Sequence, residues 1–201
     1  MKLKIIFIFI ISIFFFTGCL PMLEQAELLE KNSVVASVSG YHNFIESDDS
    51  LYSRGFDNYE YAFGGIQVRA GLSDKLEVSG QMDFDRICAG AKFLLFERDK
   101  NIVTAKISMG SLILHEIMPS MIKPALFYGR KLDDNAGVYA GTSVEYAGKF
   151  DYAGMLFAGV SIRPMEGLMH AIKLEGGFIR KITYSHMNYF YAGISFDFQI
   201  F

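Results

Sequence analysis

The chain has 201 residues, of which 51% are hydrophobic and 15% aromatic, with 19 glycines and a formal net charge of −3. This length fits one domain, and beyond the N-terminal stretch no apolar run is long enough for a membrane-spanning helix. The charges are scattered without a basic stripe, which argues against nucleic acid as a partner. Abundant aromatic residues and glycine favour a closed β architecture.

The N-terminus has the organisation of a targeting signal. Lys2 and Lys4 precede the apolar run Ile5–Phe16, and small residues follow before Cys19. A charged region, an apolar region and a small-residue cleavage site predict a signal peptide over residues 1–18.

Cys19 directly follows Thr17-Gly18, and this arrangement resembles the lipobox of bacterial lipoproteins, with Phe16 where that motif usually has Leu. The resemblance implies cleavage before Cys19 and lipidation of this residue. An ordinary secretory signal with an incidental cysteine is the alternative. By resemblance to enteric lipoprotein sorting, Leu20 in place of Asp implies the outer membrane, so we expect a bacterial outer-membrane protein that is lipid-anchored at its N-terminus.

Residues 19–32 read as a lipidated linker. The sequence LPMLEQAELLEKN, from Leu20 to Asn32, fits a tether or a short amphipathic helix. We interpret it as a periplasmic linker that is able to plug or cap a barrel mouth. If Cys19 carries lipid, Cys88 is the only remaining cysteine and no intramolecular disulfide forms; we expect Cys88 to be a small buried hydrophobe.

From residue 33 to residue 201 the pattern is that of consecutive β-strands. The clearest unit is Tyr61–Phe84, where two runs of strict alternation flank a tight turn at Ser73-Asp74. Similar runs predict about ten strands, each close to the roughly 9–11 residues that cross a bilayer as a tilted strand. We place the other strands at residues 33–44, 86–96, 103–109, 122–128, 136–146, 156–162, 168–178 and 194–200. Pro124 lacks a ladder donor and predicts a bulge or a local gap in pairing.

The fold prediction is an all-β protein: a single closed antiparallel up-and-down β-barrel of about ten strands, of the transmembrane type. Short connections at Ser73, Asp99, Asp134 and Pro164 fall after every second strand, as periplasmic turns do. Charged residues of both signs stand in mid-strand, which a lumen of paired charges requires. These predicted lumen charges are Arg69, Glu77, Asp83, Lys92, Lys106, Lys123, Glu145, Lys173, Glu175 and Asp197.

The hairpin sequence GLSDKLEVSGQMDF resembles the recurring G-L-[ST]-D-[KR]-L-E pattern of small bacterial outer-membrane β-barrel proteins. The resemblance covers most of the chain after residue 33, and it implies outer-membrane lipid and the barrel-assembly machinery as partners. The chain departs from the family at its end, because Phe201 is out of phase with the apolar residues Phe198 and Ile200.

An even strand number places both ends of the barrel on the periplasmic side, so the Ile45–Tyr59 loop would face outwards as a contact for an extracellular ligand. We expect girdles of aromatic residues near the strand ends. Their tyrosines are Tyr52, Tyr59, Tyr61, Tyr128, Tyr146, Tyr152, Tyr189 and Tyr191.

Candidate chemistry is sparse. The four histidines, His42, His115, His170 and His186, show no metal-ligand spacing, and we predict no metal, no cofactor and no catalytic residue. The first functional hypothesis is a structural or surface-interaction protein whose lumen is largely plugged by paired charges. The alternatives are a narrow pore for small solutes, a barrel enzyme acting on lipid or peptide through His115 or His186, and a soluble lipid-anchored barrel that binds an apolar ligand.

Overall fold

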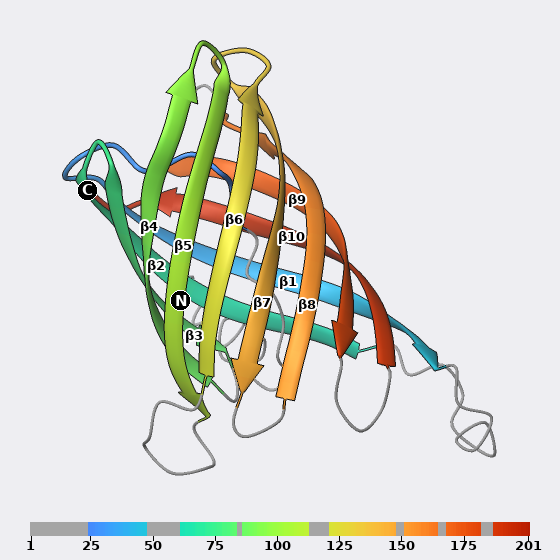
Figure 1. Cartoon of the computed structure of the whole chain (residues 1–201). Helices are drawn as coiled ribbons and strands as arrows, with labels where there is room; N and C mark the ends of the chain where they lie inside the picture. Colours follow the sequence, from blue (N-terminus) through green and yellow to red (C-terminus); the bar gives the residue numbers. More distant parts are fainter. Residues whose placement is uncertain are drawn as a thin grey trace, which may run out of the picture.

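The computed structural model describes residues 24–47, 61–83, 86–112, 121–147, 151–164, 168–181 and 187–201. Ten antiparallel strands form one closed barrel, as predicted (Figure 1). The strands are β1 (Val34–Ser47), β2 (Tyr61–Ser73), β3 (Leu76–Asp83), β4 (Arg86–Arg98), β5 (Asn101–Leu112), β6 (Met121–Lys131), β7 (Ala136–Ala147), β8 (Asp151–Ile162), β9 (Met169–Lys181) and β10 (Met187–Gln199). The predicted signal peptide and Cys19 lie outside the described residues.

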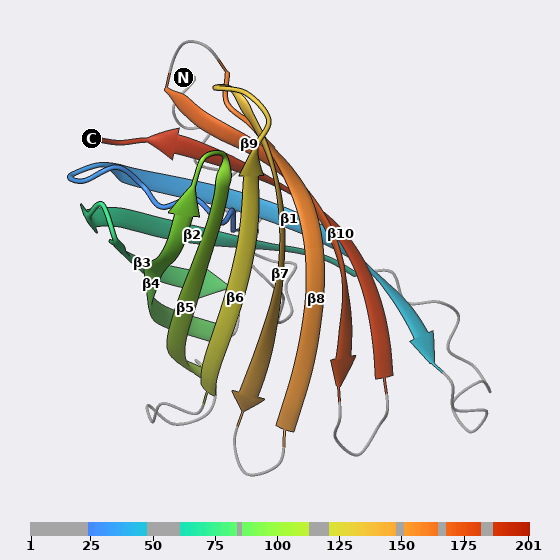
Figure 2. The same ribbon diagram turned by 45° about the horizontal axis from the view of Figure 1, so that its top comes forward.

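The barrel closes between its first and last strands. Val38 of β1 lies opposite Phe196 of β10 on one side and opposite Ile66 of β2 on the other. Every other strand pairs with its neighbours in the sequence, so the topology is up-and-down. The start of β1 and the end of β10 therefore lie at the same end of the barrel, which also carries the short turns (Figures 1 and 2). We call this the turn end and the opposite end the loop end.

Two of the predicted turns are formed by two residues. Asp74 and Lys75 join β2 to β3, and Asp99 and Lys100 join β4 to β5. Asp99 adopts a left-handed φ of 55°, a conformation in which Asp is enriched among non-glycine residues. The first turn was predicted one residue earlier, at Ser73-Asp74, and the second at its observed position. The β6–β7 turn at residues 132–135 contains the predicted Asp134.

Pro124 produces a gap in the β6–β7 ladder. Ile122 pairs with Tyr146 and Ala125 pairs with Ser143, while the two residues between them have no partner in β7. The register is the same on both sides of the gap, so the strand is not bulged. On its other side Pro124 keeps its place opposite Ile107 of β5. The missing N–H of proline accounts for the lost pairing, as predicted.

The outside of the barrel is apolar and its inside is largely polar. Leu156 is 60% exposed and Ile87 is 54% exposed, whereas Arg69 and Lys173 are 0% exposed. This distribution is that of a membrane-spanning barrel and contradicts the alternative of a soluble barrel with an apolar interior. No described helix is long and apolar enough to cross a membrane.

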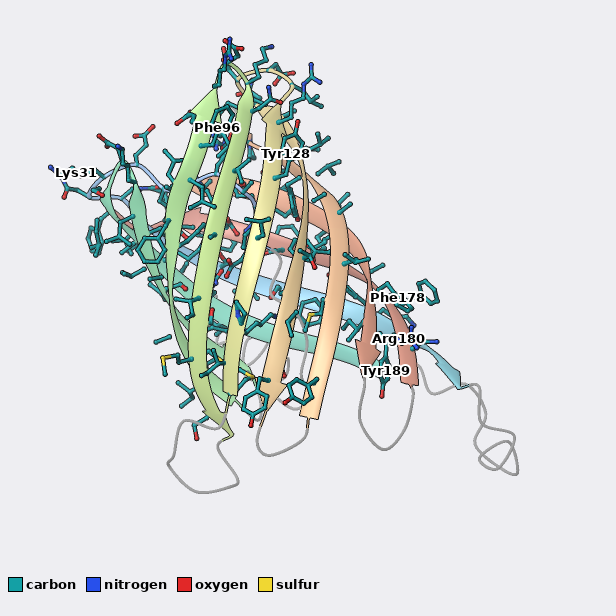
Figure 3. All side chains as sticks on the ribbon, viewed as in Figure 1. Lys31, Phe96, Tyr128, Phe178, Arg180 and Tyr189 are labelled. Atoms are coloured by element: carbon teal, nitrogen blue, oxygen red, sulfur yellow. The ribbon has the colours of Figure 1, made fainter. Side chains whose placement is uncertain are left out.

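Aromatic side chains stand on the outer surface near both ends (Figure 3). Phe96 and Tyr128 lie towards the turn end, and the half-exposed pair Tyr146 and Tyr152, with ring centroids 5.1 Å apart, lies towards the loop end. Tyr191 and Tyr189 were predicted for a girdle, but Tyr191 is 3% exposed and points into the barrel, and Tyr189 is partly buried and packs against the same interior side chains. The period-two phase of β10 is the cause, because Tyr191 shares a face with Asp197. The side chains of Tyr52, Tyr59 and Tyr61 lie outside the description.

Candidate functional site

A chain of ion pairs crosses the inner wall of the barrel. The Arg69 Nη2 atom lies 2.5 Å from Asp197 Oδ2, and the Lys173 Nζ atom lies 3.0 Å from the same oxygen. The network continues through Glu77, whose Oε1 atom lies 3.8 Å from Arg69 Nη1 and 3.4 Å from Lys92 Nζ. All five side chains are at most 1% exposed. Charges buried this deeply are stable only when they are paired, so these contacts link β9, β10, β2, β3 and β4.

The predicted lumen charges fall into three groups. Seven are buried inside the barrel, namely Arg69, Glu77, Lys92, Lys106, Lys173, Glu175 and Asp197. Lys123 and Glu145 are partly buried. The side chain of Asp83 lies outside the description.

An N-terminal segment, residues 24–33, runs from the exposed residues 30–32 at the turn end into the barrel, where residues 24–26 and 29 are buried, and it completes this network. The Glu24 carboxylate pairs with Lys106 and lies 3.8 Å from Lys92 Nζ. It also accepts a hydrogen bond of 2.5 Å from the side-chain amide of Gln67. Glu24 is 4% exposed, although it belongs to no strand. A residue of the N-terminal segment therefore supplies the anion for two lysines of the wall.

The backbone of the N-terminal segment is also bound to the wall. Lys92 Nζ donates to the Gln25 carbonyl at 3.1 Å, and Thr104 Oγ1 donates to the Ala26 carbonyl at 3.0 Å. The Leu29 amide donates to Glu77 Oε2 at 3.0 Å. These bonds satisfy polar groups that would otherwise be buried without partners, and they hold the segment in one position.

A turn next to β2 directs the segment into the lumen. Asn32 has a left-handed φ of 66°, and its amide donates to the Gly71 carbonyl at 2.8 Å. A Cβ atom on Gly71 would lie 2.1 Å from the Glu30 carbonyl oxygen, so only glycine leaves room for the chain here. Deeper in the lumen, a Cβ on Gly129 would lie 2.6 Å from the Cβ of Ala26. Glycines of two strands thus provide the space that the segment fills.

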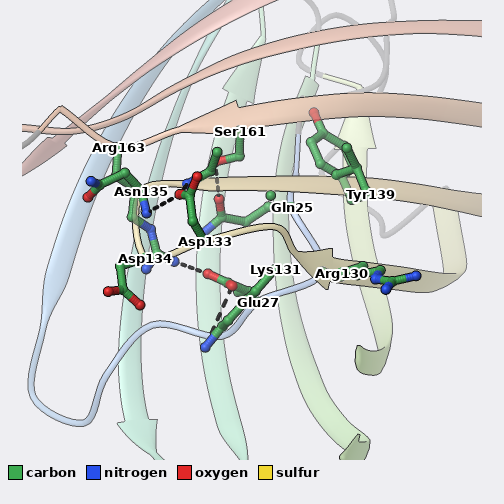
Figure 4. A pocket seen from close by; sticks show the side chains of 15 residues that line it. Gln25, Glu27, Arg130, Lys131, Asp133, Asp134, Asn135, Tyr139, Ser161 and Arg163 are labelled. Atoms are coloured by element: carbon green, nitrogen blue, oxygen red, sulfur yellow. Dashed lines mark hydrogen bonds and ion pairs between the residues drawn. The ribbon is translucent and has the colours of Figure 1, made fainter. Parts of the chain in front are cut away.

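At the turn end, the segment borders a pocket at the mouth of the barrel (Figure 4). The Glu27 carboxylate pairs with Arg163 and lies 3.7 Å from Lys131 Nζ. The Ser161 hydroxyl donates to Gln25 Oε1 at 2.8 Å. These contacts attach the segment to the β6–β7 and β8–β9 sides of the mouth, while Glu24 attaches it to the opposite wall.

The loop end of the lumen is filled differently. Tyr41, Met155, Ile179 and Tyr191 form a buried cluster, against which Phe157 and Tyr189 pack. Glu175 borders this region and accepts a hydrogen bond of 2.7 Å from the Tyr191 hydroxyl. The buried ion pairs thus lie towards the turn end, while the loop end combines this aromatic and aliphatic cluster with the partly buried Lys123 and Glu145. The cluster was not part of the predicted lumen of paired charges.

The environment of Glu24 favours its charged form. Burial by itself would raise the pKa of this carboxyl group, but the positive charges of Lys106 and Lys92 and the hydrogen bond from Lys106 outweigh it. The resulting pKa lies well below its ordinary value of 4.5. Glu24 is thus an anion throughout the physiological range of pH.

The remaining candidate residues do not form a second site in the described part of the chain. Cys88 is buried on the inner face of β4, as expected, and is not in a disulfide. His170 is partly buried at the start of β9, and His42 lies in β1. His115 and His186, the residues of the enzyme alternative, lie outside the described residues. No cluster that could hold a metal ion occurs among the described His, Cys, Asp and Glu side chains.

The contribution of the N-terminal segment could not be predicted residue by residue. Glu24, Gln67 and Thr104 were absent from the predicted site because Glu24 belongs to no alternating run and the other two are uncharged. The sequence did offer one indirect signal in Gly71, which interrupts the inner face of β2 in the same phase as Gln67 and Arg69. Small residues at such positions mark a close approach of another part of the chain.

No family model and no curated protein matches the chain. Among solved structures, an outer membrane channel from Pseudomonas putida F1 aligns with 91% of this chain and 100% of its own length, at 12% identity and a TM-score of 0.43. Ail, the attachment invasion locus protein of Yersinia pestis, aligns with 84% of this chain and 99% of its own length, at 11% identity and a TM-score of 0.31. Neisserial surface protein A aligns with 82% of this chain and 96% of its own length, at 11% identity and a TM-score of 0.33.

Proposed function

We propose that this chain is an outer-membrane β-barrel with a structural or surface-interaction role, and that its lumen is closed at both ends. The apolar exterior and the polar interior support the membrane location. The turn end, which carries both ends of the barrel, faces the periplasm in this proposal, and the loop end faces outwards. Lipidation of Cys19, assembly by the barrel machinery and ligand contact through the Ile45–Tyr59 loop stay predictions.

The observation that carries the closed lumen is the insertion of the N-terminal segment into the charge network. Glu24, Gln25 and Ala26 are each at most 4% exposed, and they contact β2, β4, β5 and β8. Beyond them, the aromatic cluster around Tyr191 occupies the lumen towards the loop end. Barrels of this size have interiors that side chains can fill. The N-terminal segment and the aromatic cluster form two successive seals, each of which closes the lumen, so we expect no steady ion conductance.

Planar-bilayer recordings of the refolded full-length protein test this proposal. The wild type should stay at background conductance, while a general porin in parallel bilayers shows that an open barrel is detected. Gly129→Leu should displace the segment, because the new side chain would occupy the place of Ala26. Tyr191→Ala should loosen the other seal. We expect each single variant to stay silent and the double variant to give discrete steps.

Gly154→Leu is the matched control for the steric change, because a Cβ at Gly154 meets no atom within 4 Å. Migration of the unboiled protein on a gel shows whether each variant has folded. Steps from the wild type would contradict the closed lumen. A folded double variant as silent as the wild type would contradict the assignment of the two seals.

A further inference from the structure

We propose that Gln67, Lys92 and Lys106 form a binding site for small aliphatic carboxylates, which Glu24 occupies from within the same chain. The inference rests on the closed lumen proposed above, because it concerns the hydrogen-bond donors and positive charges that remain on the barrel wall when the Glu24 carboxylate is absent. The donors come from β2, β4 and β5, three strands of the closed sheet, so their positions do not depend on the segment.

The chemistry of the site is specific for a carboxylate. One oxygen of Glu24 accepts from the Gln67 amide at 2.5 Å and pairs with Lys106, while the other lies 3.8 Å from Lys92 Nζ. A neutral amide in the same place could keep its carbonyl oxygen against Gln67 and Lys106, but its NH2 group would then face the ammonium group of Lys92. Charge-assisted hydrogen bonds are stronger than neutral ones, so the site distinguishes an acid from its amide.

The formal charges buried in the interior balance only when this anion is counted. Among the described residues, the buried cations are Arg69, Lys92, Lys106 and Lys173, and the buried carboxylates on strands are Glu77, Glu175 and Asp197. Glu24 is the fourth carboxylate and makes the two numbers equal. Without it the wall carries an excess positive charge in a desolvated place, which an external anion would compensate.

Two features of the wall pre-position the lysines. Lys92 lies 3.4 Å from Glu77 and 5.4 Å from the centre of the Phe127 ring, and neither contact involves the segment. Lys106 extends across Gly90, where a Cβ would lie 2.7 Å from its Cε atom. Gly90 therefore makes room for the aliphatic stem of Lys106, and the ammonium group is held towards the position of the Glu24 carboxylate.

The remaining contacts of the segment explain why only one side chain needs to be replaced. Gln25 and Ala26 are held through their carbonyl oxygens, and Gln25 also through its side chain, which accepts from Ser161. In Glu24→Ala these contacts stay. Because alanine keeps the Cβ atom, the space left by the Cγ methylene and the carboxylate has the size of acetate. Acetate is therefore the probe, and acetamide is its neutral isostere.

The test refolds full-length Glu24→Ala from urea with acetate, with acetamide or without either, so that the probe can enter before the lumen closes. Acetate should raise the temperature at which the fast-migrating gel band is lost, and acetamide should not. In a titration made by refolding at a series of acetate concentrations, the half-saturating concentration should be at least about tenfold higher after the further change Lys106→Met, since one charge-assisted contact is removed. Wild type and Glu30→Ala, whose Glu30 side chain is exposed, are the matched controls and should not respond.

Equal responses to acetate and acetamide, or a response that survives Lys106→Met, would overturn the carboxylate site. If Glu24→Ala does not fold, the same titration is made on Gly129→Leu, in which the segment is displaced and all three donors remain. The closed lumen is judged separately by the conductance of the wild type. A silent wild type together with an unresponsive Glu24→Ala would therefore refute this site and leave the proposed function in place.

Discussion

Glu24 and Lys106 form an ion pair inside the barrel although 82 positions separate them in the sequence. The pair joins a segment outside the sheet to β5, in the middle of that strand. A buried pair of this kind contributes less than its distance suggests, because both groups lost their hydration, but removing one partner leaves a buried charge alone. The consequences can be measured in several independent ways.

Glu24→Gln should lower the free energy of unfolding by about 3 kcal/mol, since Lys106 and Lys92 then lose the carboxylate they share. Lys106→Met in the same chain should restore part of this loss, because the uncompensated ammonium group is removed as well. Urea titration in lipid vesicles, with gel migration as the readout of folding, is made on Glu24→Gln, Lys106→Met and the double variant as a double-mutant cycle. Glu30→Gln, in which the charge removed is exposed, should change nothing. Strictly additive losses would show that the pair is not coupled.

Docking of the N-terminal segment should weaken in acid. The pKa of Glu24 is lowered in the folded protein, so its contribution is fully present above the ordinary value of 4.5. It declines as the pH falls below this value and is lost as the pH falls through the lowered pKa. Trypsin cannot be used at such pH, so pepsin cleavage within residues 24–33 is the measurement. We expect the rate of pepsin cleavage to rise as the pH falls from 5 to 2, roughly the range below the ordinary pKa. The rise should be steeper in the wild type than in Glu24→Gln.

Thr104→Val should release the segment in part. The Ala26 carbonyl would lose its 3.0 Å hydrogen bond in a buried place, at a cost of about 1 kcal/mol, which corresponds to about a fivefold increase in the undocked population. Lys31 is exposed at the turn end (Figure 3), and the rate of trypsin cleavage after it reports this population. Thr142→Val is the control, because the Thr142 hydroxyl bonds Met155 at 3.0 Å within the wall and does not contact the segment. Equal acceleration in both variants would contradict a specific role of Thr104.

Leu156→Arg tests the direction in which the barrel wall faces. Leu156 lies in the middle of β8 and is 60% exposed. An arginine at the midplane of a lipid bilayer should destabilise the barrel by about 2–4 kcal/mol in vesicle unfolding experiments. Leu132→Arg is the control, since Leu132 is 52% exposed but lies in the β6–β7 turn. If Leu156→Arg were as neutral as its control, the outer surface would face water rather than lipid.

The strands, their order and their phase were predictable because a half-buried strand repeats every two residues, and the repeat is visible in nearly every strand. Pro124 and Asp99 acted locally, through a missing donor and a tolerated left-handed conformation, so their effects were predictable too. The girdle prediction for Tyr191 was wrong because it relied on the position of this residue near a strand end and not on the alternation of side chains along β10. The phase was the better guide, since it fixes the side of the wall on which a side chain lies.

The site was predictable only as far as it belongs to strands. Lys92 and Glu77 stand in alternating runs, and their inner position follows from those runs. Glu24 stands in a segment without a period, and its partners are set by how the whole barrel closes. The sequence suggested that this linker is able to plug a barrel, but the pairing of one of its carboxylates with Lys106 depends on contacts between distant parts of the chain, which no local pattern encodes.

With the predicted lipid on Cys19, the depth of Glu24 in the lumen would couple the docking of the N-terminal segment to the thickness of the bilayer. The Glu24 partners Gln67 and Lys106 lie near the middle of β2 and β5. In the proposed orientation, with the middle of these strands at the bilayer midplane, about 15 Å of hydrocarbon, half of a typical bilayer core, separates the level of Glu24 from the periplasmic surface. The five residues from Glu24 back to Cys19 reach at most roughly 17 Å when fully extended. If Cys19 carries the predicted lipid, a linker of this length would have little slack whenever Glu24 is docked. Docking of Glu24 would then depend on membrane thickness. A thinner bilayer would shorten the distance that the linker must span, and a thicker one would pull Glu24 away from Lys106.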